Sequence, residues 1–194
     1  MGFFILAAGK CERFGAPKFL FPYGGIPLLK KLFQECLLVN PEYTYIITGT
    51  YHRAVASKID EERLIYNPDH AEGMASSLRL VSKISAQLGL DAVVIILSDQ
   101  PFVNHHMFEE LIRYHIEGYE VISFEKAGEP CPPSLFGKSY YKKLISLKGD
   151  IGAKKIIKEV VRKKIIKGYD HLLEDFDNIW EYLRLASKDP PEGG

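Results

Sequence analysis

The sequence contains few cysteines, and the three present form no pattern that would join them. Cys11, Cys36 and Cys131 lie far apart, and none has the C-x-x-C spacing. We therefore expect neither a disulfide framework nor a zinc site. This use of cysteine is typical of a reducing compartment, so we expect a cytoplasmic protein.

An excess of charge and a long apolar run are also missing. The 194 residues include 25 basic and 25 acidic ones, so we expect no bulk binding to nucleic acid, and any anion site must be local. No apolar run approaches the ~20 residues that span a bilayer, and we expect no membrane partner. The start, MGFFILAAG, has no basic segment before its apolar residues, which argues against a signal peptide.

Two common phosphate-binding motifs are absent as well. Neither the P-loop pattern G-x-x-x-x-G-K-[ST] nor the dinucleotide pattern G-x-G-x-x-G occurs, which argues against the usual nucleotide hydrolases and nicotinamide-dependent oxidoreductases. His105 and His106 are adjacent and would point about 100° apart on a helix, a poor arrangement for a metal. We interpret them as the start of a helix after Asn104.

What the sequence does have is an alternation of apolar runs and amphipathic stretches. We predict strands over Gly2–Leu6, Tyr43–Thr48, Arg63–Tyr66, Ala92–Leu97 and Glu120–Phe124. The fourth, AVVIIL, is apolar without alternation, as in a parallel strand covered on both faces. Helical periodicity occupies residues 27–39, 74–89 and 104–118. This order predicts a three-layer α/β sandwich with a mostly parallel sheet.

After Phe124 the pattern changes. Residues 125–137, EKAGEPCPPSLFG, are rich in proline and glycine and predict a loop crossing. Helices are predicted at 138–147, 152–161 and 178–185, with a β-like RKKIIK before the last one. We expect one domain over residues 1–187 and a disordered tail over 188–194.

Three segments place small and polar residues where ligands bind in such folds. LAAGKCERFGAPKFL follows the first strand and brings Arg13 and Lys18 into a loop of small residues, which suits a polyphosphate. In ILSDQP, Asp99 follows the most apolar strand, where a carboxylate can hold Mg²⁺. In NPDHAEGMASSL, Asn67 and Gly73 precede a helix whose free amides can bind a ligand. Solvated charges, a turn aspartate and an ordinary helix cap are the respective alternatives.

Together these segments make the sequence similar to the molybdenum cofactor nucleotidyltransferases, and more broadly to the MobA-like nucleotidyltransferases with a Rossmann-like fold. The family's first motif, L-A-A-G-x-S-x-R-M-G-x-x-K-x-L-L-P followed by G-x-P-L-L, is matched by Leu6-Ala7-Ala8-Gly9, Arg13, Gly15, Lys18, Leu20, Pro22 and Gly25-Ile26-Pro27-Leu28-Leu29. N-P-x-x-x-x-G-M-x-x-S-L is matched by Asn67, Pro68, Gly73, Met74, Ser77 and Leu78, and D-Q-P by Asp99-Gln100-Pro101. P-x-L-F and G-D-x-G-A are matched by Pro133, Leu135, Phe136, Gly149, Asp150, Gly152 and Ala153.

The resemblance covers roughly residues 3–185 and has three departures. Cys11 and Phe14 replace the usual Ser and Met with residues of near size. Cys131-Pro132 stands where the family often has Gly-His, so the acceptor could differ from molybdopterin. EDFDNIWEYL resembles the family motif D-x-D-T-P-E-D only in part, with Asp177 and Asn178 kept as a helix cap.

The resemblance implies nucleotidyl transfer from an NTP to a phosphomonoester, with release of pyrophosphate. It implies catalytic roles for Arg13 and Lys18, which would neutralise phosphate charge, and for Asp99, which would hold Mg²⁺. The nucleotide-site residues that it implies are Leu6, Ala7, Ala8, Gly9, Asn67, Gly73, Met74, Ser77 and Asp150. Asp150 is also a candidate for ordering the acceptor.

The form L-A-A-G is associated with cytidylyltransferases, whereas guanylyltransferases tend to carry L-A-G-G, and the methyl group of Ala8 would crowd a purine. We therefore expect CTP as the nucleotide, molybdopterin as the acceptor and a molybdoenzyme as a partner. The alternatives are a sugar- or alditol-phosphate nucleotidyltransferase, a GTP-using molybdopterin guanylyltransferase, and a non-catalytic nucleotide-binding accessory protein for a molybdoenzyme.

Overall fold

The computed structural model describes residues 1–150 and 152–186, so the predicted tail and the predicted domain end at residue 187 lie outside the described residues. A seven-stranded sheet has the order β5-β4-β1-β6-β8-β7-β9. Its parallel half consists of β1 (Gly2–Ala7), β4 (Thr44–Thr48), β5 (Leu64–Tyr66) and β6 (Ala92–Leu97). β2 (Pro22–Tyr23) and β3 (Ile26–Pro27) form a separate small ribbon.

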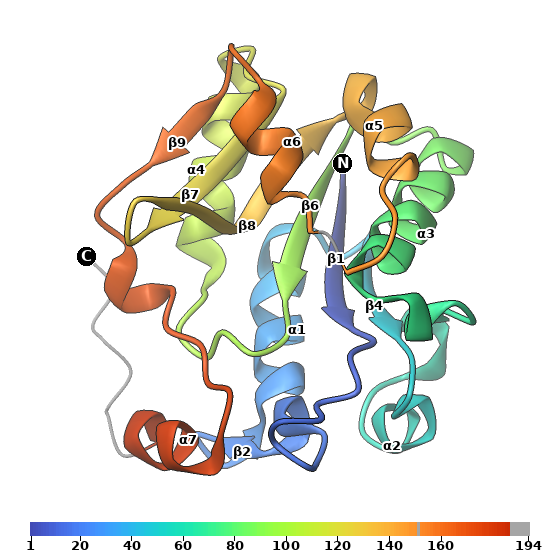
Figure 1. Cartoon of the computed structure of the whole chain (residues 1–194), viewed down its shortest axis with the longest axis vertical. Coiled ribbons are helices and arrows are strands. Elements are labelled where there is room, and N and C mark those ends of the chain that lie inside the picture. Colours follow the sequence, from blue (N-terminus) through green and yellow to red (C-terminus); the bar gives the residue numbers. More distant parts are fainter. Residues whose placement is uncertain (151, 187–194) are drawn as a thin grey trace.

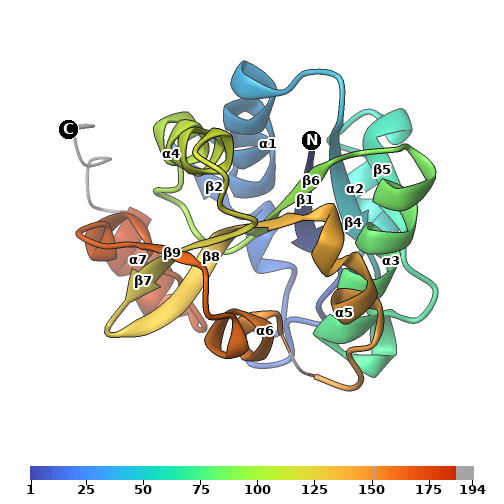
Figure 2. The ribbon, with the colours of Figure 1, turned by 90° about the horizontal axis from the view of Figure 1, so that it is seen from above.

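Helices cover both faces of the sheet (Figures 1 and 2). On one face lie α1 (Leu28–Val39) and α4 (His105–Ile116). On the other lie α3 (Met74–Gln87), α5 (Tyr141–Ile145) and α6 (Lys154–Glu159). The short helices α2 (His52–Ala56) and α7 (Ile179–Ala186) lie at the end of the molecule where β1 and β6 terminate (Figure 1). The predicted three-layer α/β sandwich with a mostly parallel sheet is thereby confirmed.

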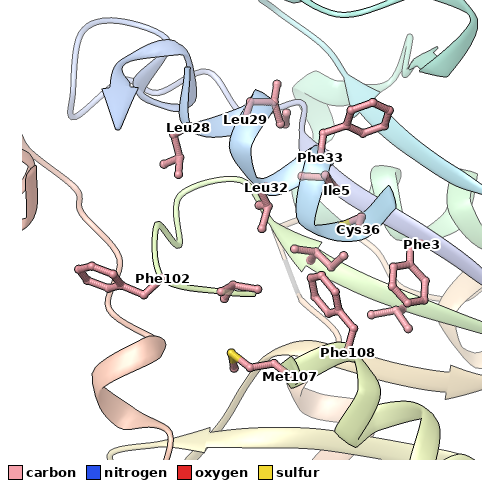
Figure 3. Packing of buried hydrophobic residues seen from close by; sticks show 14 of the residues in the cluster. Phe3, Ile5, Leu28, Leu29, Leu32, Phe33, Cys36, Phe102, Met107 and Phe108 are labelled. Atoms are coloured by element: carbon pink, nitrogen blue, oxygen red, sulfur yellow. The ribbon is translucent and has the colours of Figure 1, made fainter. Parts of the chain in front are cut away.

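The strand β1 lies between β4 and β6 and is buried along its whole length. Phe3 and Ile5 pack with α1 and α4, and the Phe3 ring meets the Phe108 ring edge-on at 5.3 Å (Figure 3). Phe4 and Leu6, which point the opposite way, pack with α3 and α5. Because side chains alternate across a strand, a strand that is covered on both faces has to be apolar throughout.

The loop crossing predicted over residues 125–137 is wrong. Those residues complete β7 (Val121–Lys126) and form β8 (Glu129–Gly137), an antiparallel hairpin inserted beside β6. The register shifts between Ser123 and Phe124, and Pro132-Pro133 lies opposite this shift without ladder partners. A bulge tolerates residues that lack an N–H, so prolines in a central strand are accommodated there. The last strand, β9 (Lys164–Ile166), pairs parallel to β7 and lies within the β-like RKKIIK.

The predicted start of α4 is confirmed, because the side chain of Asn104 accepts a hydrogen bond from the Met107 amide. Over the described part of the chain, no three His, Cys, Asp or Glu side chains are grouped to hold a metal ion. Within residues 1–150 and 152–186, every helix is too short or too polar to cross a bilayer.

Candidate active site

A cleft of about 530 Å³ runs across the carboxyl ends of β1 and β6. It receives residues from the loop after β1, the start of α3, the end of β6 and the segment before α7. Its lining includes Leu6, Ala8, Gly9, Arg13, Lys18, Gly73, Met74, Ser77, Asp99 and Asp150, all predicted from the sequence. Lys10, Cys11, Glu12, Phe14, Phe19, His70, Ala71, Glu72, Leu97, Ser98 and Asp177 line it too.

Lys18 occupies the centre of the charged end of this cleft. It begins a single 3-10 turn after β1, and the next residue, Phe19, is buried and anchors that turn. The Lys18 Nζ lies 2.8 Å from Asp99 Oδ2 and 3.1 Å from Asp177 Oδ1, and donates a 2.6 Å hydrogen bond to the Phe176 carbonyl. Burial alone would lower the pKa of Lys18, but the two carboxylates outweigh it and raise the pKa. Lys18 is therefore a fixed cation.

Asp99 follows β6 and faces Lys18 across the cleft. Burial raises the pKa of this carboxyl, and the ion pair with Lys18 opposes that rise. Its second oxygen, Oδ1, is buried and accepts no hydrogen bond from the residues that the structure describes. Burying a carboxylate oxygen without a partner is costly, so this atom has unused capacity for a ligand.

Asp177 was missed as a site residue and was expected only to belong to a helix cap. Its Oδ2 lies 2.9 Å from Arg13 Nη1, and its Oδ1 contacts Lys18, so one carboxylate joins both cations. The hydrogen bond from Lys18, followed by that from Arg13, lowers the pKa of Asp177. The partial match to D-x-D-T-P-E-D was the only sequence signal for Asp177. It did not indicate that this segment contacts the first loop, which lies about 160 residues earlier along the chain.

The predicted cap of α7 is confirmed at Asn178. Asn178 Oδ1 accepts hydrogen bonds of 3.0 Å from the amides of Trp180 and Glu181. The amide of Asp177 donates to Glu181 Oε2 at 2.7 Å. The helix start therefore fixes the backbone of Asp177, and with it the carboxylate that holds Arg13 and Lys18.

The start of α3 forms the opposite wall of the cleft. Gly73 has φ +98°, and a Cβ there would lie 2.8 Å from the Cα of Asp150, so this position requires glycine. Asp150 Oδ1 accepts a 3.2 Å hydrogen bond from the Met74 amide and so satisfies one of the free amides at the start of α3. The structure thus brings Asp150 to the start of α3, in the same wall as Gly73 and Ser77.

Two predicted site residues, Asn67 and Ala7, lie behind the lining. Asn67 is 1% exposed; its amide donates to the hydroxyls of Ser76 at 2.8 Å and Ser77 at 3.1 Å, and its Oδ1 accepts from the Asp69 amide. Ala7 is buried as the last residue of β1. Asn67 thus orders the wall that includes Ser77 rather than forming part of the surface of the cleft.

Beyond Asp99, the hairpin β7–β8 approaches the end of β6. Gln100 is 1% exposed, and its Nε2 donates to the Pro132 carbonyl at 2.9 Å and to Cys131 Sγ at 3.5 Å. Cys131 and Pro132, where the sequence departs from the family motif, therefore contact Gln100 directly.

Comparisons with known proteins agree with this architecture. The MobA-like NTP transferase domain profile matches residues 3–165. Purine catabolism protein PucB of Bacillus subtilis is 25% identical over 190 residues, covering 92% of each chain. The solved structure of Rv0371c from Mycobacterium tuberculosis H37Rv has a TM-score of 0.79 at 22% identity, covering 96% of this chain and 97% of that one. Its complex with manganese has a TM-score of 0.78 at 21% identity, with 97% and 98% covered.

Molybdopterin-guanine dinucleotide biosynthesis protein A from Archaeoglobus fulgidus has a TM-score of 0.63 at 16% identity, covering 95% of this chain and 96% of that one. At such low sequence identities, the similarity to solved structures shows the fold alone. The family profile matches most of the sequence and includes the loop after β1, the start of α3 and the end of β6. The chain belongs to the family of MobA-like NTP transferase domains, and the protein is a nucleotidyltransferase.

Proposed function

We propose that the protein transfers CMP from CTP to molybdopterin and releases pyrophosphate. The observation that carries the choice of nucleotide is Ala8, which is 6% exposed and lines the cleft at the end of β1, facing the start of α3. Its methyl group reduces the room for a base, which a pyrimidine tolerates better than a purine. A cytoplasmic location and a molybdoenzyme partner belong to the same proposal.

Divalent metal binding is part of this proposal, and Asp99 would hold Mg²⁺. The fit rests on the donor set: a carboxylate at a strand end is a ligand that Mg²⁺ prefers, and the buried Oδ1 of Asp99 lacks a hydrogen-bond donor among the described side chains and amides. When bound, the ion would supply positive charge beside the phosphates. The manganese complex of Rv0371c supports a divalent ion in a protein of this fold.

The protein's own part in the reaction is to bind and orient charge. Arg13 and Lys18 would bind the triphosphate and stabilise the charge that develops on the leaving pyrophosphate. Both cations contact Asp177 in this structure, so phosphate oxygens would exchange with that carboxylate. A phosphomonoester is already an anion near neutral pH, so the attacking oxygen needs no general base.

A sugar- or alditol-phosphate acceptor is the second candidate, because Cys131-Pro132 replaces Gly-His beside Gln100. The test is pyrophosphate release measured with each of the four NTPs, Mg²⁺ and either molybdopterin or a panel of sugar and alditol phosphates. Turnover with CTP and molybdopterin supports the proposal. Turnover with a sugar phosphate alone favours the second candidate, and nucleotide binding without any turnover would favour an accessory protein.

Ala8→Gly tests the choice of base directly. Removing one methyl group should admit guanine and shift the CTP to GTP ratio of kcat/KM by roughly 10- to 200-fold toward GTP, since one methyl in an apolar pocket discriminates by about 1–3 kcal/mol. Binding of inorganic pyrophosphate should not change, because Arg13 and Lys18 remain. A wild-type protein that prefers GTP, or a ratio unmoved in Ala8→Gly, contradicts the cytidylyl assignment and leaves nucleotidyl transfer intact.

A further inference from the structure

The proposed use of CTP raises a question of selectivity that Ala8 cannot answer. Cytosine and uracil have the same size, and they differ only at the 4-position and at N3. Cytosine carries a 4-amino donor where uracil carries a 4-oxo acceptor. A site that separates them therefore needs a polar atom of defined hydrogen-bonding character at the base end of the cleft.

Under the proposed function the triphosphate lies at Arg13, Lys18 and Asp99, which places the base on the side of the cleft away from Asp99. Arg13, Lys18 and Asp99 gather where β6 ends, whereas His70 follows β5, on the other side of β1 in the sheet order. A Cβ at Gly49 would lie 2.5 Å from the Ala8 carbonyl and 2.8 Å from His70 Cβ. His70 therefore packs over the strand ends next to Ala8, the residue that limits the size of the base.

The ring of His70 is held in one position and in one tautomer. Its Nδ1 lies 3.0 Å from the Asn67 carbonyl oxygen, and its ring lies beside that of Tyr66 at 6.0 Å. A carbonyl oxygen only accepts, so Nδ1 carries the proton and Nε2 of the neutral ring is an acceptor. Asn67 is itself fixed by Ser76 and Ser77. The acceptor is therefore preorganised before any ligand binds.

Three other polar side chains at this end each make one contact with a protein group. Glu72 pairs with Arg79, Asp150 accepts from the Met74 amide, and Ser77 accepts from Asn67. His70 lines the cleft, and its Nε2 has no hydrogen-bond partner within residues 1–150 and 152–186.

We propose that His70 is a specificity-determining residue whose Nε2 accepts a hydrogen bond from the 4-amino group of cytosine and disfavours the 4-oxo group of uracil. The inference rests on the proposed use of CTP. It assigns the two levels of selection to neighbouring residues: Ala8 selects pyrimidines by size, and His70 selects cytosine among the pyrimidines.

The test measures equilibrium binding of CTP, UTP and dCTP to the intact protein with Mg²⁺ and without an acceptor, so that no turnover is needed. Wild type should bind CTP roughly 10- to 100-fold more tightly than UTP, the effect of one buried hydrogen bond against an unpaired acceptor. His70→Phe keeps a ring of similar size but lacks Nε2, and it should bring the two affinities within about threefold of each other. His70→Ala, with its melting temperature recorded, should give the same loss of preference if the Phe variant folds poorly.

His52→Phe is the matched control, because the His52 ring meets the Tyr66 ring edge-on at 5.4 Å but lines a neighbouring recess instead of the cleft. It should leave the CTP to UTP ratio unchanged. An unchanged ratio of CTP to UTP affinity in His70→Phe overturns the inference. So does an equal loss of affinity for CTP and UTP that is absent for dCTP, because that result would place Nε2 at the ribose. If pyrophosphate is released from CTP equally by wild type and His70→Phe, with the preference over UTP retained, the proposed function stands and the inference fails.

Discussion

At the residue scale, Lys18 and Arg13 carry the same charge in different surroundings. The Lys18 side chain is 12% exposed and pairs with Asp99, whereas the Arg13 side chain is 83% exposed and pairs with Asp177. Surface pairs contribute little to stability, but a buried carboxylate that loses its cation is strongly destabilising. The two residues should therefore separate activity from stability.

We expect Arg13→Met and Lys18→Met each to lower kcat/KM by roughly 10- to 100-fold, as when one charge-assisted phosphate contact is lost. Only Lys18→Met should also lower the free energy of unfolding, by about 1–3 kcal/mol at pH 7, because Asp99 is left buried and unpaired. Pyrophosphate release and urea unfolding of both variants measure this. Equal unfolding midpoints would contradict the buried pairing of Lys18.

The pH dependence of that loss has a defined sign. Burial raises the pKa of Asp99, and removing Lys18 removes the charge that opposes this rise. A carboxyl whose folded-state pKa is raised binds a proton more readily when folded, so acidification favours the folded variant. The free energy of unfolding that Lys18→Met loses relative to wild type should be largest near pH 7. This loss should shrink as the pH falls through the raised pKa of Asp99. A deficit that grows on acidification would be inconsistent with this assignment.

Asp99→Asn should leave a folded protein that no longer responds to Mg²⁺. The amide keeps the shape of the side chain, but it loses the charge that a hard cation requires. We expect kcat/KM to fall by at least roughly 100-fold, the scale of one lost electrostatic contact in a transition state. The rate at each Mg²⁺ concentration provides the measurement. If Asp99 served only as a turn residue, Asn would replace it and the Mg²⁺ response would persist.

At the element scale, the first turn of α7 fixes the carboxylate that bridges the two cations. Asn178→Ala removes the acceptor for two amides and should cost about 1 kcal/mol. Because Asp177 directly precedes this cap, the KM for CTP should also change. Asn104→Ala removes the equivalent cap of α4 away from the cleft and should cost a similar amount with KM unchanged. Indistinguishable KM values in the two variants would show that the cap does not act on Asp177.

The elements also show what the sequence could predict and what it could not. β1 and β6 were predictable because a strand buried on both faces is apolar throughout, and α4 because Asn104 marks its start. β8 was not, since prolines normally argue against a central strand. Here Pro132-Pro133 lies at a register shift where no ladder partner exists, a circumstance that depends on β7 and is invisible in the segment itself.

The candidate site divides in the same way. Arg13, Lys18 and Asp99 were predicted as candidate site residues from their positions after strand ends, and the structure brings all three into one cleft. Asp177 lies on an element far along the chain and becomes part of the cleft only through tertiary contact. The burial of Asn67 behind Ser77 likewise depends on side-chain packing that spacing does not encode.

At the scale of the whole molecule, the cleft joins segments from both ends of the described chain, so a ligand there should stabilise the entire fold. CTP with Mg²⁺ at about 100 times its dissociation constant should add about 2.7 kcal/mol, or roughly 5–10 °C in Tm for a chain of this size. Thermal unfolding followed by circular dichroism measures the shift, and Asp99→Asn is the control that should lose its Mg²⁺-dependent part. A shift that appears without Mg²⁺ and is unaffected by Asp99→Asn would contradict the proposed metal site.

The antiparallel β7–β8 hairpin bears on how such an enzyme can evolve. β8 runs antiparallel to β6, and Cys131 and Pro132 near its start contact Gln100, which follows the end of β6. These three residues lie outside the described lining of the cleft, so substitutions in β8 alter the surroundings of the β6 end without replacing Arg13 or Lys18. If Cys131 and Pro132 contribute to the proposed acceptor site, acceptor preference can change through this one hairpin while the loop proposed to bind phosphate stays the same.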